Sequence, residues 1–293
     1  MALKQVSLVS TMVIGALARC GAELSPELKA NYEIPTRTAS IASADPIEVN
    51  TYIQVITNGS TIDDGYLTSE QLDKQKAVMN DVFADHSIQF NFLDTTYTEN
   101  EDWAHGIMMQ DMSIALRKGS YKDLNIFFLQ SMGGQVTGQC SFPLNLTDFP
   151  DPGRMKSLDG CMVVSSTIPG GSHPTYNGGL TAVHEVGHWF GLIHVFTDTC
   201  GGNRDEVDDT PEQATATYGC PTGKDSCPEF PGVDSIHNYS EFISDGVTLS
   251  PKACLLMILE VDYSDDYCKT EFTPGQVSRM HNAWATYREP VDA

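Results

Sequence analysis

Residues 184 to 194 read H-E-V-G-H-W-F-G-L-I-H, and no other segment says as much about the architecture and the chemistry of this chain. Residues four apart share one face of an α-helix, so His184 and His188 can bind one metal ion. Glu185 lies beside them, where it can take a proton from a metal-bound water. Gly191 can adopt a positive φ and turn the chain, which brings His194 to the same ion. Three neutral histidines leave the fourth position of a tetrahedral zinc ion open, as in catalytic sites.

A bare H-E-x-x-H pattern has a second interpretation. Such pentads occur by chance on ordinary helices, as two surface histidines beside a glutamate. Here Gly191 and His194 extend the pattern to H-E-x-x-H-x-x-G-x-x-H, and each added residue has a mechanical role. The extended pattern favours a catalytic zinc site, and its third histidine excludes thermolysin-type enzymes, which use a glutamate there.

Length and charge limit the classes of protein to which the chain can belong. Its 293 residues suffice for one catalytic domain with a hydrophobic core, or for two small domains. The 39 acidic residues outnumber the 17 basic ones and give a net charge of −22, which argues against nucleic acid and membranes as partners. We expect a monomer whose copies repel one another.

The first residues predict secretion. Lys4 precedes an apolar stretch, Val6 to Ala18, that ends in an A-L-A cleavage site, so residues 1–18 are expected to be a signal peptide. No later apolar run is long enough for a transmembrane helix. The sequons at Asn58 and Asn145 agree with an extracellular glycoprotein. The eight cysteines fit an oxidising compartment and lack metal-site spacing, so disulfides are expected.

Hydrophobic periodicity predicts alternating strands and helices after a polar N-terminal extension or pro-segment at residues 19–45. Thr68 and Gln71 form a capping box that starts a helix ending near Asp85. The other expected elements are strands at 47–57, 88–92 and 124–129, strand-like segments at 136–142 and 161–165, a short helix ending near 117–119, and helices at 180–192 and 274–287. This order predicts an α/β (α+β) catalytic domain over residues 46–293, with a twisted, mostly parallel sheet carrying the zinc helix.

Several further motifs resemble those of the metzincin metalloproteases of the pappalysin group, most closely the secreted fungal members. They are Leu116–Gly119, Asp123–Asn125, Gly138–Pro143, Asp209–Pro211, Ile236–Tyr239, Asp262–Asp266 and Phe272–Gln276. The resemblance implies a secreted zinc endopeptidase that acts on proteins or peptides. It also implies a loop-rich lower subdomain after Gly191, below an upper one with the sheet and the zinc helix. An unpaired edge strand near residues 136–142 would pair with an extended peptide, which disfavours a zinc hydrolase for other substrates.

The resemblance assigns roles to individual residues. Glu185 would accept the proton of the attacking water and return it to the leaving amine. Tyr263 matches a family tyrosine that helps to stabilise the oxyanion; it could also be an ordinary loop tyrosine. In some relatives the residue before the last cysteine lines the specificity pocket, and here it is Tyr267, which predicts no charged preference.

The resemblance also implies metal-binding and disulfide partners. Residues 205–210 resemble the family's calcium-binding loop, although a solvated acidic turn would look the same. The calcium ligands would be Asp205, Val207 and Thr210. Two disulfides follow the family pattern, Cys200–Cys227 and Cys220–Cys268. Cys140 and Cys161 lie on strand-like segments flanking the site and are the natural third pair, Cys140–Cys161.

Cys20 is left over. It lies in Arg19-Cys20-Gly21 and resembles the R-C-G element by which metzincin pro-segments block zinc, since a thiolate would occupy the position that water needs. We therefore predict a latency role for Cys20. The alternatives are a disulfide with Cys254 and removal within a longer signal peptide.

Residues 240–261 interrupt a family motif. In the family a methionine stands between the counterparts of Tyr239 and Asp262 and forms the floor beneath the zinc histidines. Here residues 240–261 stand in its place, and a retained intron whose removal recreates an ATG codon would explain both boundaries and the missing methionine. The alternative is a real insertion in which Met257 takes the methionine's place. A disrupted turn also keeps open a second function, that of a catalytically impaired or silent relative.

Overall fold

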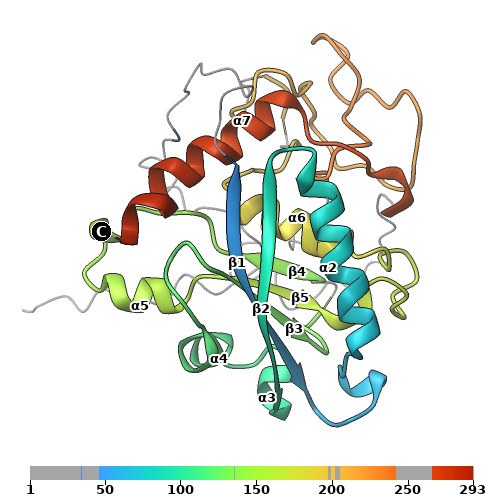
Figure 1. Cartoon of the computed structure of the whole chain (residues 1–293). Helices are drawn as coiled ribbons and strands as arrows, with labels where there is room; N and C mark the ends of the chain where they lie inside the picture. The colour runs from blue at the N-terminus through green and yellow to red at the C-terminus, as the bar shows by residue number, and fades with distance from the viewer. Residues whose placement is uncertain are drawn as a thin grey trace, which may run out of the picture.

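The computed structural model describes residues 34, 46–134, 136–196, 199–201, 205–241 and 266–292. Its centre is a five-stranded sheet with the order β2-β1-β3-β5-β4 (Figure 1). The strands are β1 (Ile47–Thr57), β2 (Ile88–Glu99), β3 (Leu124–Leu129), β4 (Gly138–Cys140) and β5 (Cys161–Val164). β1 pairs in parallel with β2 and β3, and β3 with β5, whereas β4 runs antiparallel to β5. The predicted mostly parallel sheet is confirmed.

Helices cover both faces of this sheet, because the central strand is apolar on both. In β3, Ile126 and Phe128 point into the main core, whereas Phe127 and Leu129 point into a second one on the opposite face. The main core is covered by α2 (Ser69–Ala84), α6 (Leu180–Trp189) and α7 (Pro274–Ala283). The second core is covered by α3 (Glu101–Ala104) and α4 (Met109–Leu116), which Figure 1 shows below the sheet while α7 crosses above it.

Local sequence signals explain where these helices begin. Thr68 caps α2 by accepting a hydrogen bond from the Gln71 amide, and the Gln71 side chain accepts one from the Thr68 amide at 3.0 Å. Thr273 and Gln276 repeat this capping box at α7. The shorter helices are α5 (Pro152–Ser157) and the 3₁₀ turns Ile62–Asp64, Leu146–Asp148, Ser165–Thr167, Asp266–Cys268 and Glu289–Asp292.

Three elements differ in extent from the prediction. The zinc helix ends at Trp189 rather than near residue 192, because the Leu192 amide turns back to the Gly187 carbonyl. The last helix leaves α geometry after Ala283 and continues as a π-turn to Arg288. The strand expected at 136–142 is reduced to the residues of β4 that lie opposite β5.

The described residues between Leu192 and Glu241 contain no helix or strand, only an isolated bridge between Phe196 and Gln213 and one between Asn238 and Glu271. Disulfides Cys200–Cys227 and Cys220–Cys268 cross-link this region, and Cys140–Cys161 joins β4 to β5. The structure thus contains all three expected pairs and the loop-rich, disulfide-linked lower part.

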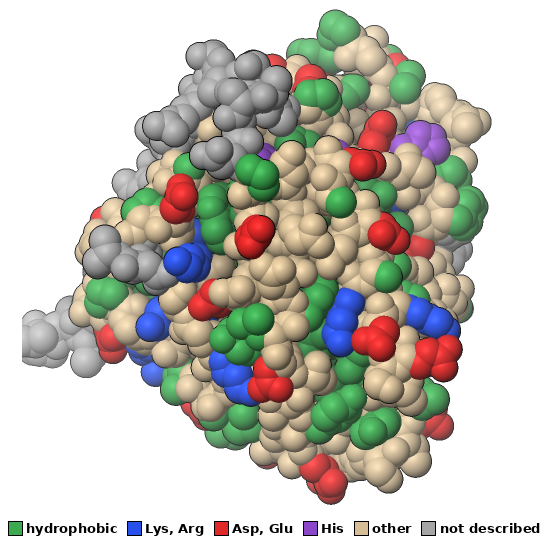
Figure 2. Space-filling model, in the orientation of Figure 1, with side chains coloured by type: hydrophobic (Ala, Val, Ile, Leu, Met, Phe, Trp, Pro, Cys, Tyr) green, Lys and Arg blue, Asp and Glu red, His purple; other side chains and the backbone are tan. Residues whose placement is uncertain are grey.

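The surface agrees with the acidic composition. Figure 2 shows carboxylate side chains scattered over the visible face rather than gathered in one patch. Within the described ranges no helix is long and apolar enough to cross a membrane.

Candidate active site and metal centre

The three histidines of the motif converge on one point. The Nε2 atoms of His184 and His188 lie 2.8 Å apart, and the Nε2 atom of His194 lies 3.3 Å from the first and 3.2 Å from the second. Gly191 has a φ of 93°, the positive value that the turn toward His194 was predicted to need. A tetrahedral zinc with Zn–N bonds of about 2.0–2.1 Å places its ligand nitrogens about 3.3 Å apart, so this nitrogen triangle fits zinc.

Backbone carbonyls fix the orientation of two of these rings. Nδ1 of His184 lies 2.8 Å from the Tyr239 carbonyl, and Nδ1 of His188 lies 2.7 Å from the Leu192 carbonyl. A carbonyl oxygen can only accept, so each Nδ1 carries the proton and each Nε2 presents a lone pair toward the centre. Burial, followed by the neighbouring histidines, holds the pKa of His184 well below its usual 6.5. The neutral imidazole, the form that binds a metal, is therefore favoured.

Glu185 is fully buried beside the histidines. It comes from the same helix, α6, whose Val183 and Val186 are packed into the main core. Its carboxylate lies against Gly138, the first residue of β4. The structure therefore brings the expected ligands, the expected base and the edge strand together.

The strand beside Glu185 is the end strand of the sheet. Gly138, Gln139 and Cys140 pair with Val163, Met162 and Cys161, respectively. On its other side β4 has no neighbouring strand within the part of the chain that the structure describes. Such an edge presents backbone donors and acceptors to which an extended peptide can pair.

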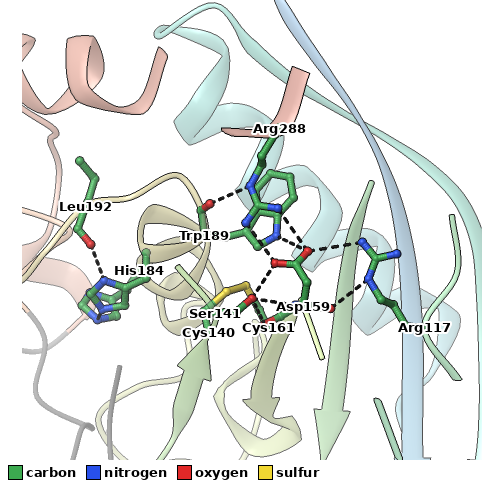
Figure 3. The surroundings of a disulfide bond; sticks show 11 residues. Arg117, Cys140, Ser141, Asp159, Cys161, His184, Trp189, Leu192 and Arg288 are labelled. Carbon is green, nitrogen blue, oxygen red and sulfur yellow. Dashed lines mark hydrogen bonds and ion pairs between the residues drawn. A yellow bond between two sulfur atoms is a disulfide. The ribbon is translucent and has the colours of Figure 1, made fainter. Parts of the chain in front are cut away.

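A buried charge cluster lies behind the site, and the sequence analysis missed it. The Asp159 carboxylate accepts hydrogen bonds from Ser141 Oγ (2.7 Å), Arg288 Nη2 (3.1 Å), Trp189 Nε1 (3.2 Å) and Arg117 Nη2 (3.4 Å). Figure 3 shows Asp159 between the two arginines, next to the Cys140–Cys161 disulfide. The Arg288 guanidinium lies 3.5 Å from the centroid of the Trp189 ring. The cluster thus joins the end of the edge strand, the end of the zinc helix and the end of the π-turn that follows α7.

The expected calcium ligands also come together. Thr210 Oγ1 lies 2.6 Å from Asp205 Oδ2 and 2.8 Å from the Val207 carbonyl oxygen. Asp205 is buried, and this burial raises its pKa to about 6. The nearby Asp209 carboxylate has a different role: it accepts hydrogen bonds from the Thr273 hydroxyl and from the Gly275 amide at the start of α7.

A cavity of about 600 Å³ opens at the start of α6. Tyr267, the residue expected at the specificity pocket, lines it together with the apolar side chains of Val78, Pro174 and Leu180. Tyr267 is 74% exposed.

The remaining candidate residues are the sequon asparagines and four residues that the structure does not describe. Asn145 is exposed and Asn58 is half-buried. Asn238, in a sequon only because Ser240 follows Tyr239, is buried and exchanges two hydrogen bonds with Gln276, so it is no acceptor for a glycan. Cys20, Cys254, Met257 and Tyr263 lie outside the described residues.

Comparisons with known proteins agree with this geometry. The family model described as pregnancy-associated plasma protein-A, peptidase family M43, matches residues 121–285, more than half of the chain. An extracellular metalloprotease of Pyricularia oryzae is 42% identical over 291 residues, which cover 96% of this chain and 94% of that protein. One from Neurospora crassa is 44% identical over 242 residues, covering 83% of this chain and 76% of that protein.

Solved structures show the same fold. Mirolysin in complex with compound 9 has a TM-score of 0.62 at 22% identity and covers 83% of this chain and 93% of its own. Mature mirolysin of Tannerella forsythia with a cleaved peptide has a TM-score of 0.59 at 22% identity, covering 85% and 99%. Together with the family match, they show that this chain belongs to peptidase family M43, the pappalysins, and is a zinc metallopeptidase.

Proposed function

We propose that this protein is a secreted endopeptidase that hydrolyses peptide bonds, with His184, His188 and His194 as zinc ligands and Glu185 as general base. The observation that carries the proposal is the convergence of three Nε2 atoms, 2.8 to 3.3 Å apart, beside a buried carboxylate. Residues 1–18 are the signal peptide and residues 19–45 the pro-segment in this proposal. The extracellular relatives support secretion.

Zinc bound by the three imidazoles supplies a Lewis acid and lowers the pKa of a water molecule. Glu185 accepts the proton of the attacking water and then gives it to the leaving amine. Its burial removes competing solvent and keeps the carboxylate beside the reacting atoms. The phenol of Tyr263 donates a hydrogen bond to the developing oxyanion, by its match to the family motif.

The substrate binds as an extended strand along the open side of β4. Pairing through the backbone does not depend on the substrate's sequence, so selectivity comes from side-chain pockets. The cavity beside Tyr267 has apolar walls at Val78, Pro174 and Leu180 and one carboxylate, that of Asp266, so we propose it as a side-chain pocket that disfavours acidic residues. Calcium binding by Asp205, Val207 and Thr210 belongs to the same proposal, because Thr210 Oγ1 lies 2.6 Å from Asp205 Oδ2 and 2.8 Å from the Val207 carbonyl oxygen.

A second candidate is a catalytically impaired relative, and the chain after Tyr239 favours it. The Tyr239 carbonyl lies 2.8 Å from His184 Nδ1, and the residue that follows Tyr239 is Ser240 rather than the methionine of the family motif. Glu241 is buried and accepts hydrogen bonds of 2.6 Å from the Gln213 side chain and the Thr217 amide. If a single methionine replaced residues 240–261, Asp262 would follow that methionine, and its carboxylate would stand at the position that Glu241 occupies here.

One experiment separates the two functions. The purified protein, after removal of the pro-segment that carries Cys20, is assayed for zinc content and for cleavage of a denatured protein substrate, in parallel with Glu185→Ala. The endopeptidase proposal expects one zinc per chain in both forms and cleavage by the unaltered chain alone. Zinc binding without cleavage by either form supports the impaired relative. Cleavage by the alanine variant overturns the assignment of the base.

A further inference from the structure

The edge strand approaches the general base so closely that a side chain has no room between them. A Cβ atom added to Gly138 would lie 2.7 Å from both Cγ and Cδ of Glu185, and it would also collide with Oε1. Such separations are shorter than any that packed carbon atoms adopt. Gly138 is the first residue of β4, and it is buried.

Backbone conformation does not explain the glycine. Gly138 has no positive φ and pairs regularly with Val163, so an alanine could adopt the same backbone. The contact with Glu185 is what excludes a side chain.

Both ends of β4 are held in place, so the strand cannot move away from Glu185. On one side the Val164 amide donates a hydrogen bond of 2.8 Å to the Thr137 carbonyl. On the other side Cys140 is bonded to Cys161, and the Ser141 amide donates a bond of 3.1 Å to the Gly160 carbonyl. Any added atom at residue 138 must therefore displace the Glu185 side chain.

We infer that Gly138 is a positioning residue. Its missing side chain lets the substrate-binding strand run directly against the zinc helix and sets where the Glu185 carboxylate lies. Glu185 has no exposed surface, so a displaced carboxylate has no solvent to move into and leaves the place where it meets the attacking water. The inference deepens the proposed function and assumes that Glu185 is the base.

The test compares Gly138→Ala with the control Gly153→Ala. Gly153 lies on α5 and is exposed, and a Cβ there would meet only Asp151 Oδ1, at 3.5 Å. Gly153→Ala should keep wild-type Tm, zinc content and kcat. Gly138→Ala should keep its zinc but lose on the order of 10²-fold in kcat, the scale of general acid–base catalysis, with KM changed by less than about threefold. A Gly138→Ala enzyme with wild-type kcat overturns the inference.

Double variants make the outcome decisive even if Gly138→Ala is unstable. Combining it with Glu185→Ala removes the colliding side chain, so the Tm lost through Gly138→Ala should return. Glu185→Asp shortens the side chain and should reduce kcat less in the Gly138→Ala background than in the wild type. A Tm that Glu185→Ala does not restore, or effects of the two substitutions that simply multiply, contradicts the inference. If the protein is inactive after removal of the pro-segment, or Glu185→Ala is active, the proposed function fails instead.

Discussion

Replacing Asp159 by asparagine should reduce the free energy of unfolding by about 3–5 kcal/mol, the range for removing one partner of a buried ion pair. Asp159 is 3% exposed and Arg288 is completely buried. Asparagine has nearly the same shape but no charge, so the guanidinium groups of Arg288 and Arg117 lose the carboxylate that lies 3.1 and 3.4 Å away. The NH₂ group of asparagine can only donate hydrogen bonds, whereas both oxygens of Asp159 accept them, so this group would face other donors.

The assay is thermal unfolding of the zinc-loaded protein. For a domain of this size, each kcal/mol moves Tm by about 2–4 °C, so the expected decrease is about 6–20 °C. Asp94→Asn is the matched control, because Asp94 pairs with Lys118 at 2.7 Å while the side chains are 53% and 36% exposed. Exposed pairs contribute less than about 1 kcal/mol, so the control should unfold near the wild-type temperature.

Adding Arg288→Met to the Asp159 variant removes a buried charge together with its partner. This double variant should be more stable than the sum of the two single effects predicts. The reasoning would be refuted by an Asp159→Asn protein whose Tm matches that of Asp94→Asn, or by additive effects in the double variant.

Three further predictions concern metals and the interrupted motif. His194→Ala should reduce zinc to well below one ion per chain, measured by atomic emission, and tight stoichiometric zinc would mean that the third ligand is misassigned. Burial raises the pKa of Asp205 to about 6 from 3.8, so the calcium-free protein is stabilised by this proton below about pH 4 and loses about 3 kcal/mol as pH rises through 6. Added calcium should therefore raise Tm at pH 7 and much less at pH 5, and equal increases would contradict the calcium site. Replacing residues 240–261 by one methionine should raise Tm and kcat; a spliced transcript that keeps the segment, with full activity of the long form, would count against the intron.

Local signals predicted much of the fold. The capping box of Thr68 and Gln71 marks the start of α2, and the apolar run Ile126–Leu129 marks β3 as a strand buried on both faces. The convergence of His184, His188 and His194 follows from helical spacing and one glycine turn, which are also properties of a short segment.

What the sequence did not reveal depends on distant contacts. The apolar pattern of the zinc helix continues to Leu192. In the structure, however, the Leu192 carbonyl accepts a hydrogen bond from His188 Nδ1 and the Leu192 amide donates one to the Gly187 carbonyl, so the helix ends at Trp189. In the Asp159 cluster the hydrogen bonds between Asp159 and Arg288 span 129 positions of the chain, and no spacing rule connects the two residues. The same applies to Gly138, whose neighbour Glu185 is visible only once the edge strand is placed on the helix.

The position of Arg288 links completion of the Asp159 cluster to the order of synthesis. Arg288 donates a hydrogen bond of 3.1 Å to the Trp189 carbonyl, across 99 residues of chain. At roughly 5–20 residues per second, about 5–20 s pass between the synthesis of the zinc helix and that of this arginine. During that interval the growing chain has Glu185 and the histidines, while Asp159 has Arg117 but not yet Arg288 as its charged partner. The cluster that joins the end of β4 to the end of α6 is therefore completed only when synthesis reaches Arg288, well after the whole zinc motif has been made.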